Sequence, residues 1–146
     1  MQNVTIRNIL VASVVAGTGL MPALAAADES KMNEELVSRH LGEFGAGNME
    51  GLLADYTNDA FLMTPNGTIR GKDELRKLFE GLFAEFGQEG VTFNLAHQSC
   101  DGNICQIVWD AETPDNSYEF ATDTFVIEDG KIVAQTLAAK VTPKAK

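Results

Sequence analysis

The order of the predicted elements constrains the fold of this chain more than any other sequence feature. Helical patterns come first, and four consecutive strand-like runs follow at 91–99, 104–113, 118–127 and 131–141. Their separators are typical of tight hairpins; they are Asp101-Gly102-Asn103, Pro114-Asp115-Asn116 and Glu128-Asp129-Gly130. Helices followed by an antiparallel meander predict an α+β domain, in which a curved, mostly antiparallel sheet wraps around about three helices.

The helices are predicted from capping residues and apolar spacing. Ser30 is a candidate N-cap for a first helix, which Gly45-Ala46-Gly47 would end. Asn48 begins a short second helix that extends to Tyr56. Residues 72–86 carry a strong apolar stripe, which predicts a third helix against the sheet.

The N-terminus has the layout of a secretory signal peptide. Arg7 precedes an uncharged run over 9–20, and the small-residue tract 23–27 follows. A membrane anchor would need about 20 apolar residues, and this run is short and rich in small and hydroxyl side chains. We expect cleavage after Ala25 or Ala27, which leaves residues 28–146 as one domain, either periplasmic or secreted.

The acidic composition narrows the range of partners. The formal net charge is −10, and removal of 1–27 makes the mature chain one unit more negative because Arg7 is the charge lost. Such a surface repels nucleic acid and anionic lipid. We therefore expect no nucleic-acid partner and no membrane association after cleavage.

Cys100 and Cys105 flank a turn signal, Asp101-Gly102-Asn103. A two-residue turn would place them opposite each other across a hairpin, and export permits a structural disulfide. Redox catalysis would require Cys-x-x-Cys, which this spacing does not provide. This register conflicts with the apolar pattern, because it puts Trp109 on the opposite face from Phe93. Either both faces of the sheet are buried or the turn contains a bulge.

Three segments, in order, resemble SnoaL-like proteins of the nuclear transport factor 2-like superfamily. The run Gly45-Ala46-Gly47-Asn48-Met49-Glu50-Gly51-Leu52-Leu53-Ala54-Asp55-Tyr56-Thr57-Asn58-Asp59-Ala60 is similar to the helix-turn-helix opening of the family. Thr64-Pro65-Asn66-Gly67 with Gly71-Lys72-Asp73-Glu74-Leu75 resembles its strand, turn and third-helix start, and residues 123–132 resemble its last hairpin. The resemblance implies a cone whose mouth admits a small, usually apolar molecule. It also implies a homodimer through the exposed face of the sheet.

The resemblance to the family's ketosteroid isomerases can be carried to single positions. Their oxyanion-hole aspartate corresponds to Asp123, and their oxyanion-hole tyrosine corresponds to His40. Their general-base aspartate corresponds to Thr64, which ends an expected strand over 60–64. A threonine hydroxyl cannot take a proton from carbon as a carboxylate does, so isomerisation by that mechanism is not expected.

Asp123 and His40 are the candidate catalytic residues on physical grounds as well. Alternation puts Asp123 on the inward face with Phe125, where a carboxyl group would have a raised pKa and could donate a proton. His40 lies on the apolar stripe of the first helix, a position that could bring it near Asp123 in the cone. Asp123 could instead satisfy a donor within the sheet, and His40 could be a partly buried core residue.

The candidate ligand contacts are aromatic, sulfur-bearing or hydroxyl side chains expected near a pocket. They are Tyr56, Phe61, Met63, Thr64, Phe83, Trp109 and Phe125. Many of these would be needed in any core of this size. His97 is expected on the strand face of Phe93 and Leu95, and no carboxylate at metal-ligand spacing lies beside either histidine, so no metal and no cofactor are expected.

Three functions remain open. The chain could bind a small apolar molecule without turnover, which the missing base at Thr64 favours. It could be a lyase, cyclase or isomerase that acts on a small apolar substrate by acid–base chemistry at Asp123, with His40 as a second candidate. It could also be a homodimeric interaction module without a ligand. A hollow pocket would separate the first two from the third.

Overall fold

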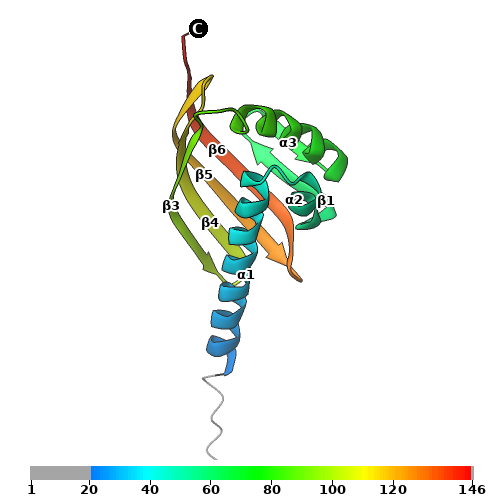
Figure 1. The fold of residues 1–146 in the computed structure, drawn as a ribbon. Coiled ribbons are helices and arrows are strands. Elements are labelled where there is room, and N and C mark those ends of the chain that lie inside the picture. Colours follow the sequence, from blue (N-terminus) through cyan, green and yellow to red (C-terminus); the bar gives the residue numbers. More distant parts are fainter. Residues whose placement is uncertain (1–20, 146) are drawn as a thin grey trace, which may run out of the picture.

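The computed structural model describes residues 21–145. It contains three helices and six strands (Figure 1). The helices are α1 (Met21–Gly45), α2 (Met49–Ala54) and α3 (Lys72–Phe86); the strands are β1 (Tyr56–Thr64), β2 (Gly67–Arg70), β3 (Thr92–Asp101), β4 (Ile104–Glu112), β5 (Asn116–Glu128) and β6 (Lys131–Pro143). The predicted α+β fold is confirmed.

The six strands form one curved sheet in the order β2-β1-β6-β5-β4-β3. All neighbouring pairs are antiparallel except β1 and β6, which are parallel. The predicted meander supplies β3 to β6, and the parallel pairing attaches the N-terminal β1–β2 hairpin to its last strand. The sheet is therefore mixed and open, as in a cone.

The core lies between the concave face of this sheet and the helices. Val37 of α1, Leu52 of α2 and Leu75 of α3 are fully buried there. They pack with Phe125 and Ile132 from the sheet. The apolar stripe over 72–86 correctly predicted α3 because burial on this concave face requires such a stripe.

The helix starts and ends differ from prediction in two places. Helix α1 begins at Met21 instead of Ser30. The Ser30 hydroxyl donates to the carbonyl of Ala26 and accepts from the backbone N–H of Gly102, so it ties α1 to the β3–β4 turn and does not cap the helix. Tyr56 lies outside α2 and begins β1, because it pairs with Ile132 of β6.

The strand prediction near the N-terminus was too short. Strand β1 begins four residues before the expected Ala60, and β2 was not predicted at all. Both depend on pairing with residues distant in sequence or across a tight turn. Local alternation carries little of that information.

The signal peptide prediction falls mainly on residues outside the described part of the chain. Of the expected 1–27, only 21–27 are described, as the first turns of α1. No helix within 21–145 is long and apolar enough to cross a membrane. Cleavage and export therefore stay predictions.

A bulge in β3 resolves the register conflict of the sequence. Cys100 pairs with Cys105 as expected, whereas Leu95 pairs with Trp109 and His97 with Val108, so one extra residue lies between Leu95 and His97. The bulge lies in the strand and not in the turn. It turns Phe93 and Leu95 to the face of Trp109 and places His97 on the opposite face, which corrects its expected position.

Cys100 and Cys105 form a disulfide across the β3–β4 hairpin. The loop that it closes is short, so the chain-entropy model gives about 2 kcal/mol of stabilisation. Replacing both cysteines by alanine should lower the free energy of unfolding by about that amount. Urea unfolding with and without reductant tests this: reductant should destabilise the parent chain and leave the double variant unchanged.

Candidate functional site

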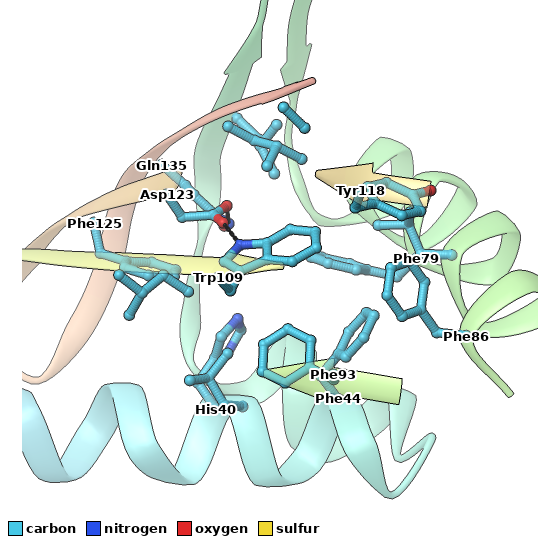
Figure 2. Close-up of a pocket in the computed structure, with 16 residues that line it drawn as sticks. His40, Phe44, Phe79, Phe86, Phe93, Trp109, Tyr118, Asp123, Phe125 and Gln135 are labelled. Carbon is cyan, nitrogen blue, oxygen red and sulfur yellow. Dashed lines mark hydrogen bonds between the residues drawn. The ribbon is translucent and has the colours of Figure 1, made fainter. Parts of the chain in front are cut away.

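A cavity lies between the concave face of the sheet, α1 and α3 (Figure 2). Its volume is about 90 Å³. Pockets that hold drug-sized ligands measure roughly 300–1,000 Å³. The cavity as it stands therefore fits only a small or slender group.

The wall of the cavity has a polar end and an aromatic end. Figure 2 shows His40, Asp123 and Gln135 gathered on one side, and the rings of Phe44 and Phe86 on the other. The Trp109 indole lies between, with its nitrogen toward Asp123. A molecule in this cavity would meet hydrogen-bonding groups at one end and aromatic carbon along the rest.

Asp123 is the centre of the polar end and is only 5% exposed. Trp109 on β4 donates from Nε1 to Oδ2 over 2.8 Å, and Gln135 on β6 donates from Nε2 to Oδ1 over 2.7 Å. The two donors lie on the strands that flank β5, diagonal to Asp123, where long side chains reach each other. Both carboxyl oxygens therefore have a partner inside the sheet.

Burial raises the pKa of Asp123 above its ordinary value. The hydrogen bonds from Trp109 and Gln135 and the nearby His40 act in the opposite direction without cancelling it. Burial raises the pKa because a charged carboxylate loses its hydration in an apolar cavity. Asp123 thus keeps a proton to higher pH than a surface aspartate does.

A chain of hydrogen bonds runs from Asp123 to Asp55, which is also buried. Tyr56 donates its hydroxyl proton to Oε1 of Gln135, and the same hydroxyl lies 3.3 Å from Nε2 of His40. On the other side of the ring, Nδ1 of His40 lies 3.2 Å from Oδ2 of Asp55. Asp55 also pairs with Arg39. Residues from α1, the α2–β1 junction, β5 and β6 are thereby joined in one network.

The hydrogen bonds of this network allow two arrangements of its protons. In the first arrangement the Tyr56 hydroxyl donates its one proton to Gln135, so its oxygen accepts a hydrogen bond from Nε2–H of His40. Asp55 accepts from the other ring nitrogen. In that arrangement both ring nitrogens of His40 donate, one to Asp55 and one to Tyr56. If Asp123 is protonated and the Gln135 amide reversed, the same contacts are satisfied by a neutral His40.

The flanking groups are held in single protonation states. Burial alone would raise the pKa of Asp55, but the hydrogen bonds from His40 and Arg39 outweigh it and lower the pKa overall. Burial, with the charges of Asp123 and Asp55, raises the pKa of Tyr56 well above its ordinary value. Asp55 is therefore an anion and Tyr56 a neutral hydroxyl at neutral pH, so Tyr56 is not activated as a nucleophile.

Glu85 holds Tyr118, one of the residues that line the cavity. Its carboxylate accepts from the Tyr118 hydroxyl over 2.9 Å and from Asn116 Nδ2 over 2.7 Å, and it also accepts from Thr113 Oγ1. Burial and this carboxylate raise the pKa of Tyr118. These bonds tie α3 to the β4–β5 turn, so Glu85 acts here as a structural group.

The structure brings some of the predicted site residues together. Asp123, His40, Trp109 and Phe125 line the cavity, and Tyr56 lies directly behind it through its bonds to His40 and Gln135. Their roles toward a ligand stay predictions.

Four other predicted contacts lie away from the cavity wall. Strand alternation turns Ala60 and Leu62 inward, so Phe61 and Met63 point to the other face. Phe61 lies under the guanidinium of Arg70, and Met63 is largely exposed. Thr64 bonds within the β1–β2 turn. Phe83 lines a neighbouring hollow.

Two members of the network were not predicted from the sequence. Gln135 looked like an ordinary strand residue, and Asp55 like a polar residue at a helix end. A polar residue within an apolar strand was the available signal for Gln135. No local signal existed for Asp55, because α1 supplies its partners.

The family follows from a match between this chain and a known family model. The model of the SnoaL-like domain matches residues 37–135, which is most of the chain. The chain belongs to the SnoaL-like domain family. None of the curated proteins compared with it matches.

Solved structures share the fold of this SnoaL-like domain at low identity. A Kribbella flavida protein assigned as a ketosteroid isomerase has a TM-score of 0.67 at 11% identity, with 81% of this chain and 84% of that chain covered. The epoxide hydrolase/cyclase-like enzyme SalBIII, from polyether salinomycin formation, has a TM-score of 0.66 at 18% identity, with 78% and 96% covered. A de novo designed protein with a curved β-sheet has a TM-score of 0.64 at 16% identity, with 75% and 86% covered. Since enzymes and a designed scaffold share the fold, it does not decide the activity.

Proposed function

We propose that this SnoaL-like protein binds a small, largely apolar molecule that carries one polar group, and that it does so without turnover. The observation that carries the proposal is the hollow, two-ended cavity, with Asp123, Gln135 and His40 at one end. An apolar pocket with a few convergent polar groups is the usual form of a small-molecule site. A hollow interior favours a ligand-binding role over a purely structural module.

The groups around Asp123 favour binding without turnover. Its two oxygens accept bonds from Trp109 and Gln135, which hold it in place. Thr64 stands where the related isomerases have their base, and its hydroxyl bonds to Gly67 and Asn66 outside the cavity. No second carboxyl group lines the cavity among residues 21–145.

Acid–base catalysis is the second candidate, and the raised pKa of Asp123 favours it. An enzyme of this kind would be a lyase, cyclase or isomerase in which Asp123 donates a proton to the substrate. The hydrogen bonds that link Gln135 through Tyr56 to His40 would hold such an acid in position.

Replacing Asp123 by asparagine separates the two candidates. Native mass spectrometry of the protein from the cells that produce it should first reveal a retained apolar compound. For a binder, the variant should weaken the affinity for that compound by about tenfold or less, the value of one hydrogen bond. For an enzyme, turnover should fall by roughly 10²–10⁴. Asp110→Asn, an exposed carboxylate on β4, is the matched control.

We also propose that the protein is exported and that it acts as a homodimer through the outer face of the sheet. The signal-like N-terminus and the Cys100–Cys105 disulfide support export to an oxidising compartment. Exposed Ile104 and Phe120 on the sheet support an association surface. N-terminal sequencing of the protein from periplasmic and medium fractions tests export. Light scattering tests the homodimer.

A further inference from the structure

A second hollow adjoins the aromatic end of the cavity. It lies where α1 and α3 end and β3 begins, and its volume is about 340 Å³. Four residues line both hollows: Leu41, Phe44, Phe86 and Phe93. Their side chains form the partition between the inner cavity and this outer hollow.

The aromatic side chains of the partition lie close to one another and to Trp109. The Phe44 and Phe86 ring centroids are 5.6 Å apart, and Phe93 stacks at 5.4 Å from Trp109. Phe93 is 44% exposed and lies on the edge strand β3. Exposed side chains change rotamer within nanoseconds, so the partition can open without moving the sheet.

The outer hollow is lined by apolar side chains, by Gln88 and in part by backbone. Gly45, Gly47, Gly87 and Gly90 contribute walls without side chains. The described residues around it include no acidic or basic side chain. A Cβ added at Gly45 would meet no atom within 4 Å. The hollow therefore has room for an uncharged chain, and no charged side chain among its described lining residues would pair with a charged one.

We propose that the two hollows form one elongated site for an uncharged molecule with a polar end group and an extended apolar tail. The polar group lies at the Asp123 end, and the tail passes between Phe86 and Phe93 into the outer hollow. This inference rests on the proposed function and specifies its ligand class. The small inner volume of about 90 Å³ is the reason that a longer ligand needs the outer space.

Filling the outer hollow should shorten the ligand that the protein accepts. Gly45→Phe is the test variant, and Gly42→Phe is the matched control on the same helix, where a Cβ also meets no atom within 4 Å but the residue does not line the hollow. Butanol and octanol are the probes, because their hydroxyl can donate and accept. Trp109, the one tryptophan of the chain, reports binding by its fluorescence.

In the parent chain, octanol should bind more tightly than butanol, by about fourfold in Kd for each methylene that leaves water. Gly45→Phe should weaken octanol by roughly tenfold or more and leave butanol unchanged. Gly42→Phe should change neither. Val91→Phe, which also lines only the outer hollow, repeats the test if Gly45→Phe does not fold.

Two results overturn the inference in distinguishable ways. If butanol binds and Gly45→Phe leaves the octanol affinity intact, the elongated site is wrong and the proposed binding function stands. If neither alcohol binds the parent chain, both are wrong.

Discussion

Replacing Asp55 by alanine should lower the free energy of unfolding by about 3–5 kcal/mol. Asp55 is 3% exposed, and it accepts from Nδ1 of His40, whose side chain is buried as well. Removal of the carboxylate leaves that ring nitrogen without a partner in a site that water does not reach. An uncompensated buried group of this kind is among the costliest that a single substitution creates. Urea unfolding at pH 7 measures the loss.

Two further variants show which contact carries the effect. Asp55→Asn keeps an oxygen that can accept from His40 but removes the charge, so it should cost less than alanine. Arg39→Gln should cost at most about 1 kcal/mol, because the Arg39 side chain is 55% exposed and water screens its pairing with Asp55. A loss below 1 kcal/mol for Asp55→Ala would contradict the view that this carboxylate anchors the network.

The Asp55→Ala variant should also change how the free energy of unfolding depends on pH below neutrality. The folded pKa of Asp55 lies below its ordinary value of 3.8, so its stabilisation is present above 3.8 and is lost as the pH falls toward the lower folded value. Asp123 acts oppositely: its folded pKa is raised, so its contribution is present below 3.8 and is lost as the pH rises through the folded value. Asp55→Ala should therefore flatten the loss of stability below pH 3.8 and leave the Asp123 effect at higher pH.

Replacing Phe125 by alanine should cost about 3–5 kcal/mol and enlarge the cavity. Phe125 is 1% exposed, lines the cavity and packs edge-on against His40 at a centroid distance of 5.8 Å. Because β5 is held on both sides by neighbouring strands, the site cannot collapse to fill the lost volume. Thermal unfolding should show the loss, and benzene should recover part of it, since dry apolar cavities bind such molecules.

Phe83→Ala is the matched control for this prediction. Phe83 is half-buried at the outer hollow, so its loss should cost clearly less and benzene should not recover it. An equal cost for the two variants, or no recovery of Phe125→Ala with benzene, would show that Phe125 does not support a ligand cavity.

Much of the site was predictable because it depends on local pattern. Alternation along β5 placed Asp123 and Phe125 on the inward face, and the structure buries both. Helical spacing put His40 on the buried side of α1 in the same way. Neither pattern could identify Asp55 or Gln135 as members of the hydrogen-bond network, because their partners lie on other elements.

The strand predictions failed where the structure depends on more than the local sequence pattern. Alternation was applied to β3 without its bulge, so His97 was placed on the wrong face. A single extra residue reverses every side chain beyond it. The N-terminal part of β1 depends on its parallel pairing with β6, which lies more than seventy residues away in the chain.

The sequence by itself determined the α+β class, the bounds of α3, the hairpin register at Cys100–Cys105 and the inward orientation of Asp123. These follow from periodicity and turn chemistry, which are properties of neighbouring residues. Only the tertiary structure decided that Asp123 is linked through Gln135 and Tyr56 to His40 and Asp55, and that the cavity continues into an outer hollow. Those features arise where the sheet curves over α1 and α3, and distances between separate elements are set by packing and not by any local pattern.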